Sequence, residues 1–340
     1  MVFASWALAC PPPVEAHVRH YVGQALVNLS RPDEALDHIR RAHTILESEP
    51  DPWLSVECSD WEACALYMKE DPRALSVAER ALKLCRSTRP RLPGTEARIL
   101  EHIATIHVRN HTYERAVALY EEALQVAGGI RDLARLGRTY HGLSIAYQQR
   151  GELVRATEFA HKALALYALE HDLGLLARGE NELGLLLMKQ GQHSRAEEAF
   201  RAALGHFHES GTDTAKSHVL LSLAELQMKT GRLDESVTTV KEALDLAGRL
   251  GERLAESTGH ELLGRVHELM GRRQLADRQF RAAQKLLRAN ALWDRLAESH
   301  ASYAELLEAR GEGVAASKHW KEAASLALNR HPTARATAMR

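Results

Sequence analysis

Residues 181–203 read NELGLLLMKQGQHSRAEEAFRAA and hold the pattern that decides the fold. A Leu183-Gly184 pair comes before Gly191, and an alanine and phenylalanine series follows it. The same skeleton returns with a period of 40 residues, the step from Gly151 to Gly191. It can be followed in Gly151, Gly191, Gly231, Gly271 and Gly311, and in Ala116, Ala156, Ala196, Ser236, Ala276 and Ala316. A fixed period of this length is typical of a solenoid of repeated units.

Each repeat has apolar residues at helical spacing on both sides of its glycine, which predicts two helices joined by a turn. Glycine adopts the left-handed backbone conformation without strain and so ends the first helix. A small residue in the first helix, such as Gly184, lets the two helices approach closely, while larger residues such as Phe200 fill the space beside it. We therefore expect Gly184→Leu to destabilise the protein by more than about 1 kcal/mol.

The pattern predicts an all-α solenoid of about eight helical hairpins. We divide the chain into an N-terminal segment (residues 1–15), repeats 1 and 2 (16–86), a proline-rich joint (87–95), repeats 3 to 8 (96–329) and a disordered tail (330–340). In the joint, Pro90, Pro93 and Gly94 interrupt the helical pattern. We expect repeats 1 and 2 to swing at this joint.

Composition argues against several classes of function. Lys plus Arg (44) nearly balance Asp plus Glu (45), so the chain as a whole presents no positive field, and no direct binding of nucleic acid is predicted. No apolar run is long enough to span a bilayer, and the N-terminus lacks the basic start of a secretory signal. The cysteines Cys10, Cys58, Cys64 and Cys85 lack the spacing of a zinc site and indicate buried thiols in a reducing compartment. We expect a soluble, cytoplasmic protein.

Nineteen histidines and many carboxylates form no recognisable catalytic or metal-binding motif. The sequence has no Gly-x-Ser-x-Gly, no phosphate loop and no His-Glu-x-x-His. His107 and His267 stand at the repeat position that Tyr147 and Leu187 fill elsewhere, so we interpret them as core or boundary residues. The sequence therefore predicts no enzyme activity, no cofactor and no metal site.

The repeats resemble tetratricopeptide repeats. Small and large residues pair in the first helix, alanine begins the second, an aromatic residue follows four positions later and another alanine three positions after that. The resemblance covers about residues 16–328 and is strongest at 140–163 and 180–203. Arrays with this long period resemble the C-terminal sensor regions of bacterial helix-turn-helix regulators. The resemblance implies a right-handed superhelix in which the first helix of each repeat lines the concave face.

The resemblance also implies which side chains face a peptide or protein segment in the concave groove. The family's inner-face positions in repeats 3 to 6 are Arg98, Glu101, Arg109, Arg138, His141, Gln148, Arg178, Asn181, Glu182, Met188, Lys189, His218, Glu225 and Lys229. In repeats 7 and 8 they are Glu261, Arg265, Glu268, Glu298, Glu305 and Glu308. The groove is therefore predicted to be positive in its middle and negative towards its C-terminal end. We expect its centre at Arg138, Arg178, Asn181 and Lys189.

Two functions fit this sequence. The first is non-enzymatic binding of a peptide or protein segment, as the sensor or scaffold part of a bacterial regulatory protein. Asn and Gln side chains can pair with a peptide backbone, and Arg can bind a carboxylate through two hydrogen bonds. The alternative is a scaffold or homo-oligomerisation module without a dedicated peptide site, and in that case Trp320 in the last repeat is a candidate for a homodimer contact. Under either function, any DNA-reading part of the protein would lie outside these residues.

Overall fold

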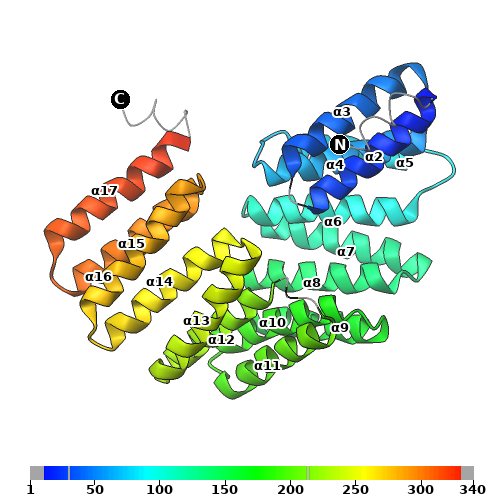
Figure 1. The fold of residues 1–340 in the computed structure, drawn as a ribbon. Helices are drawn as coiled ribbons and strands as arrows, with labels where there is room; N and C mark the ends of the chain where they lie inside the picture. Colours follow the sequence, from blue (N-terminus) through cyan, green and yellow to red (C-terminus); the bar gives the residue numbers. More distant parts are fainter. Residues whose placement is uncertain (1–10, 30, 212, 214, 331–340) are drawn as a thin grey trace. The chain divides into compact units, whose positions relative to one another are not determined.

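The computed structural model describes residues 11–29, 31–211, 213 and 215–330. These residues form sixteen helices and no strand, which confirms the predicted all-α class (Figure 1). The chain divides into two compact units, Met1–Asp172 (unit 1) and Leu173–Arg340 (unit 2).

Eight helices belong to each unit. Unit 1 contains α2 (Pro12–Asn28), α3 (Pro32–Ser48), α4 (Pro52–Met68), α5 (Ala74–Ser87), α6 (Pro93–Arg109), α7 (Tyr113–Ile130), α8 (Leu133–Gln149) and α9 (Leu153–Leu169). Unit 2 contains α10 (Leu173–Lys189), α11 (His193–Glu209), α12 (Lys216–Lys229), α13 (Leu233–Leu250), α14 (Arg253–Leu269), α15 (Arg273–Ala289), α16 (Trp293–Ala309) and α17 (Gly313–Arg330).

The helices pack as eight hairpins, from α2 with α3 to α16 with α17, so the predicted number of repeats is confirmed. We call the first helix of each hairpin its A helix and the second its B helix. Contacts between non-consecutive helices join A helices: α2 with α4, α4 with α6 and α6 with α8 in unit 1, and α10 with α12 and α12 with α14 in unit 2. The A helices α2, α4, α6 and α8 of unit 1 therefore form one continuous layer, and so do α10, α12 and α14 of unit 2.

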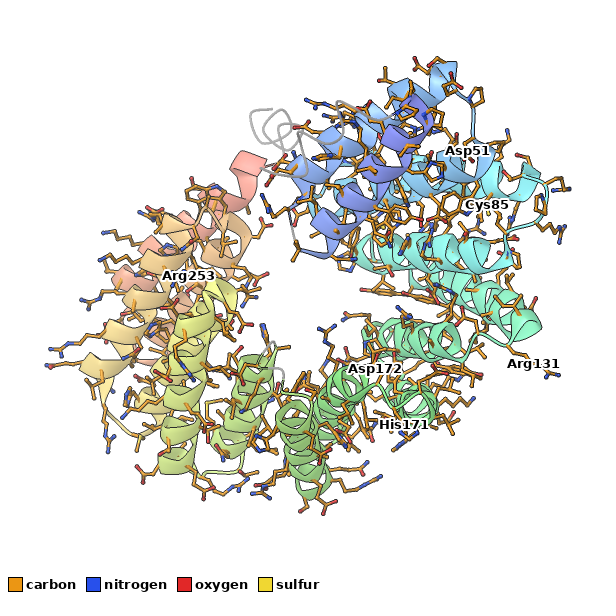
Figure 2. All side chains as sticks on the ribbon, turned by 45° about the vertical axis from the view of Figure 1, so that its right-hand side comes forward. Asp51, Cys85, Arg131, His171, Asp172 and Arg253 are labelled. Carbon is orange, nitrogen blue, oxygen red and sulfur yellow. The ribbon has the colours of Figure 1, made fainter. Side chains whose placement is uncertain are left out.

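Turn geometry repeats with the sequence. Gly151, Gly191, Gly231, Gly271 and Gly311 have φ between 73° and 81°, so the predicted left-handed glycines end the A helices. A second left-handed series occurs where a B helix passes to the next A helix, at Arg131, His171, Gly211, Gly251 and Ala291. Figure 2 labels Arg131 and His171. Hairpins 4 to 7 are thus each preceded and followed by a left-handed residue.

Close packing within the hairpins explains the small residues of the A helices. A Cβ atom at Gly184 would lie 2.5 Å from Cε1 of Phe200, whose side chain is fully buried. At Gly264 the corresponding contact is with Phe280, at 2.9 Å. Ala196 and Ala276 are also completely buried. The predicted close approach of the two helices is present, and each aromatic ring it buries contributes roughly 1.5–3 kcal/mol.

Local signals define several helix starts. α2, α3, α4 and α6 begin with proline, whose missing N–H would have no intrahelical partner there. Asp51 caps α4 by accepting from the Leu54 backbone N–H at 3.0 Å, and Asp132 does the same for α8 through Arg135. These caps fix where an A helix begins and therefore which of its side chains reach the A-helix layer.

The predicted joint lies within unit 1, where α5 ends at Ser87 and α6 begins at Pro93. Arg86 connects both sides by an ion pair with Glu96 at 2.8 Å, and swinging at this place stays a prediction. Residues 1–10 and the predicted disordered tail at 331–340 lie outside the described residues. Among the residues that are described, none of the helices has the length and apolar character needed to cross a membrane.

Candidate functional site

A groove runs along the A helices of unit 2. Its first part is a hollow of about 290 Å³, lined by Asn181, Leu185, His218, Leu221, Ser222, Glu225, Thr258, Glu261, Leu262, Arg265, Phe280 and Ser302. Its second part has a volume of about 520 Å³ and is lined by Met228, Arg265, Glu268, Leu269, Ser302, Glu305 and Leu306. Arg265 and Ser302 line both parts, so we treat them as one surface and call it the unit 2 groove.

The unit 2 groove combines apolar and acidic side chains. Leu185, Leu221 and Leu262 contribute apolar surface to its first part. Four glutamates, Glu225, Glu261, Glu268 and Glu305, and one arginine, Arg265, supply its formal charges. Its lining is therefore acidic, which favours a segment that carries positive charge beside apolar side chains.

Some of the groove's glutamates form ion pairs with neighbouring residues of the protein. Glu225 pairs with Lys229 at 3.0 Å, and Glu268 pairs with Arg310, whose side chain is only 3% exposed. Burial raises the pKa of Glu261, against the opposing effects of a Ser299 hydrogen bond and the Arg295 charge. These contacts hold the carboxylates in place before any partner arrives.

The structure brings together seven of the fourteen predicted inner-face residues of unit 2. Asn181, His218, Glu225, Glu261 and Arg265 line the first hollow, and Arg265, Glu268 and Glu305 line the second part. The Asn181 Oδ1 atom is buried and has no hydrogen-bond partner among the described residues. Arg178, Lys189 and Lys229 are exposed but are not among the lining residues. Met188 is only 6% exposed and packs among core residues.

The predicted residues of unit 1 do not gather in one hollow. Arg98 is held by two carboxylates, Glu57 at 2.7 Å and Asp60 at 2.8 Å. The Arg109 guanidinium lies over the Tyr67 ring, 3.4 Å from its centroid, and donates to the Tyr67 carbonyl. Arg138 is exposed, whereas His141 and Gln148 are half-buried.

Several acidic positions also have partners inside the protein. Glu101 is buried and accepts hydrogen bonds from Arg135 at 2.8 Å and from Thr139. Glu298 pairs with Arg295, and Glu308 accepts a hydrogen bond from the Trp320 indole at 2.9 Å. The acidic positions that line the groove are Glu225 and Glu268, which have the internal partners named above, and Glu261 and Glu305.

The histidines and cysteines that the sequence analysis assigned to the core or its boundary can now be located. His267 is 7% exposed, and burial lowers its pKa. His107 is half-buried, and its Nδ1 lies 2.8 Å from the Thr112 hydroxyl. Both residues therefore occupy the core or boundary positions expected of them. Cys58 and Cys85 are buried free thiols, and burial raises the pKa of each, to about 12 and about 11.

Sequence reasoning missed a polar cluster between α4 and α6, which we call the α4–α6 cluster: Glu57, Asp60, Cys64, Arg98 and His102. The Asp60 side chain is completely buried. Burial alone would raise the Asp60 pKa, but the charges of His102 and Arg98 hold it below its ordinary value. The cluster had no local signature, because its members come from two repeats, 38 to 42 residues apart.

Comparison with known proteins agrees with the repeat pattern. Models of the tetratricopeptide repeat match residues 95–168 in unit 1 and residues 181–205 in unit 2. The chain is 23% identical over 270 residues to the 43 kDa receptor-associated protein of the synapse from Tetronarce californica, covering 75% of this chain and 64% of that protein. It is 25% identical over 155 residues to the regulatory protein AfsR from Streptomyces coelicolor, covering 46% of this chain and 15% of AfsR. The chain thus spans less than two thirds of these relatives.

A solved structure shares the fold. A Rap protein in complex with Competence and Sporulation Factor superposes with a TM-score of 0.60 at 12% identity, covering 93% of this chain and 98% of that one. At this identity the likeness concerns the fold alone. The repeat matches, the periodic glycines and the paired helices together lead to one conclusion: residues 95–168 and 181–205 match tetratricopeptide repeats, and the chain resembles part of a bacterial regulatory protein.

Proposed function

We propose that this chain binds an extended peptide or protein segment along its A helices, as the recognition part of a cytoplasmic regulatory protein, and that it catalyses no reaction. The observation that carries the proposal is the unit 2 groove, whose lining comes, apart from Phe280 of α15, from the A helices of four successive hairpins. An extended segment lying across such a groove would contact each hairpin in turn.

The chemistry of the groove supports a peptide ligand. Its leucines offer places for apolar side chains, and the amide of Asn181, which lines the first hollow, has a donor and an acceptor group that can pair with a peptide backbone. Its four glutamates favour lysine or arginine in the bound segment. Binding across several hairpins could also change the pitch of the array, because each hairpin contacts only its neighbours.

The comparisons support the regulatory part of the proposal. AfsR is named a regulatory protein, and the Rap protein was solved with Competence and Sporulation Factor bound. The proposal assigns this chain a regulatory role, as in AfsR, and the binding of a partner, as in the Rap complex. The predicted basic residues Arg178 and Lys189 of unit 2 remain part of the proposal as a second contact region for an acidic portion of the ligand, and Arg138 of unit 1 remains a predicted contact by itself.

Capture from native lysate tests the proposal. Immobilised full-length chain is compared with an Asn181→Ala/Arg178→Glu variant and with an Arg201→Glu control on the B helix α11, and bound proteins are identified by mass spectrometry. We expect a partner that the wild type and the control retain and that the double variant loses at least about tenfold, the effect of about 1.4 kcal/mol. Equal retention by all three proteins would reject the assigned residues.

The alternative is a scaffold or homodimer without a peptide site. It is favoured by exposed apolar side chains on the last helix, α17, where Val314 is 92% and Trp320 37% exposed. Under this alternative the lysate experiment recovers only the chain itself. Light scattering would then show a dimer that Val314→Glu converts to a monomer.

A further inference from the structure

The α4–α6 cluster holds three different potential metal ligands around one point. Asp60 and Cys64 lie one helical turn apart on α4, and His102 faces them from α6. His102 Nδ1 lies 2.7 Å from Asp60 Oδ1 and 3.3 Å from Cys64 Sγ. The three donor atoms all lie within 4.8 Å of one another.

This arrangement differs from a catalytic relay. In a Cys-His-Asp relay the histidine uses one ring nitrogen for the nucleophile and the other for the carboxylate. Here the same nitrogen, Nδ1, approaches both Asp60 and Cys64. Nδ1 can donate a hydrogen when it is protonated or accept one from the Cys64 thiol when it is not, but it cannot do both at once. Donor atoms that converge on one point fit a bound cation better than a proton relay.

The surrounding side chains orient the ligands as an outer shell would. Arg98 donates from Nε to Asp60 Oδ2 at 2.8 Å, which leaves Oδ1 directed at the cluster. Arg98 also donates to Glu57 at 2.7 Å, and Thr95 holds the other Glu57 oxygen at 2.9 Å. Hydrogen bonds of this kind to a ligating carboxylate are usual in metal sites. The orientation of Asp60 is thus fixed from outside the three donor atoms.

Charge balance is compatible with a divalent ion. The two carboxylates of Glu57 and Asp60 face the Arg98 guanidinium. A divalent cation would displace the His102 proton, and the cation, one Cys64 thiolate and a neutral His102 added to these groups leave the cluster with no net charge, as a largely buried site requires. The His102 side chain is 27% exposed, so an ion can reach the cluster from solvent.

We propose that Asp60, Cys64 and His102 form a binding site for a transition-metal ion of the zinc class. Sulfur, imidazole and carboxylate ligands together favour Zn²⁺ or Co²⁺ over Mg²⁺ or Ca²⁺. Zinc bonds of about 2.0–2.3 Å imply ligand atoms roughly 3–4 Å apart in a tetrahedral site, a range that includes the 3.3 Å between His102 Nδ1 and Cys64 Sγ but not the shorter 2.7 Å to Asp60 Oδ1. Three protein ligands leave a fourth position for water or for a group of a partner. An ion here would join hairpins 2 and 3 across the predicted joint.

Cobalt binding tests the site. Purified full-length chain, freed of metal with a chelator, is titrated with Co²⁺ and observed by absorption spectroscopy. We expect one Co²⁺ per chain, a thiolate-to-cobalt charge-transfer band, visible bands of a four-coordinate ion, and loss of all these bands when Zn²⁺ is added. Absence of the charge-transfer band in the wild type would overturn the proposal.

Variants locate the ligand. Cys64→Ala should abolish the charge-transfer band, and His102→Gln should weaken Co²⁺ binding at least about tenfold, the size of effect known even for outer-shell changes. Cys85→Ala, which removes a buried thiol of the same unit, should leave the band unchanged. A band that persists in Cys64→Ala or disappears in Cys85→Ala contradicts the assignment.

Thermal unfolding separates ligand loss from misfolding. Without metal, Cys64→Ala should melt close to the wild type, because Cys64 is only half-buried. Added Zn²⁺ should raise the melting temperature of the wild type and of Cys85→Ala but not of Cys64→Ala, since an ion that binds only the folded state stabilises it by mass action. An equal rise in all three proteins contradicts the proposed site.

Discussion

Gly184→Ala tests the packing of a single hairpin, because its effect should be opposite to what alanine normally does in a helix. The added Cβ would lie 2.5, 2.7 and 2.9 Å from three ring atoms of Phe200. The Phe200 side chain is fully buried, so the ring cannot move aside without disturbing the hairpin core. Alanine therefore forces α10 and α11 apart.

The magnitude follows from two opposing effects. Replacing glycine by alanine inside a helix ordinarily stabilises by about 0.5–1 kcal/mol. Overpacking a filled core costs about 1–3 kcal/mol. Since three ring atoms are approached below contact distance, we expect the second effect to dominate and Gly184→Ala to destabilise by about 1–2 kcal/mol.

Gly205→Ala is the matched control within the same hairpin. Gly205 lies inside α11, and a Cβ atom there would meet no atom within 4 Å. This variant should stabilise by about 0.5–1 kcal/mol, because it gains helix propensity without a clash. The two glycine-to-alanine variants are thus predicted to have opposite signs.

Hydrogen exchange of the α10 and α11 amides measures the effect locally, which suits a solenoid whose hairpins open in part. The opening free energy should fall in Gly184→Ala and rise in Gly205→Ala. Adding Phe200→Leu to Gly184→Ala should cost less than the sum of the two single changes, because the smaller side chain accommodates the Cβ. Equal stabilisation by both alanine variants would refute the packing argument.

Two further predictions concern charge and pH in unit 2. Arg310→Met should lower the opening free energy of α16, measured by hydrogen exchange, by about 2–4 kcal/mol, because it leaves Glu268 and Asp277 without their buried cation. A decrease below about 0.5 kcal/mol contradicts this prediction, since the loss of a solvent-exposed ion pair would cost that much. Burial, then the His319 charge, lowers the His300 pKa from 6.5 to about 4, so stability should be unaffected above pH 6.5 and lost as pH falls towards 4. His300→Gln should remove up to about 3 kcal/mol of this acid-induced loss in urea unfolding, and an unchanged pH dependence contradicts it.

The repeat could be predicted because equivalent positions of successive repeats carry the same or similar residue types. Gly191 and Ala196 mark positions where only small residues fit or where the backbone is left-handed. The second left-handed series could not be predicted, because Arg131, His171 and Ala291 share no side-chain property. These residues are exposed, so the connection fixes their backbone while solvent leaves their side chains unconstrained.

The site was only partly predictable for a related reason. Repeat position told which residues lie on A helices, and Asn181, His218 and Glu225 do meet in one hollow. It did not tell which charges have internal partners, because a residue such as Arg98 meets Asp60 from the neighbouring repeat. Pairs about one period apart on successive A helices could have revealed this contact, since equivalent turns of neighbouring A helices lie side by side.

Site-specific photo-crosslinking tests the proposed groove most directly. A photoreactive amino acid is placed at Ser222, which lines the unit 2 groove, or at Thr238, which is exposed on the B helix α13. After exposure to native lysate, we predict a discrete crosslinked product from Ser222 that Asn181→Ala diminishes, and no such product from Thr238. The same product from both positions, or none from Ser222, would contradict peptide or protein binding in this groove.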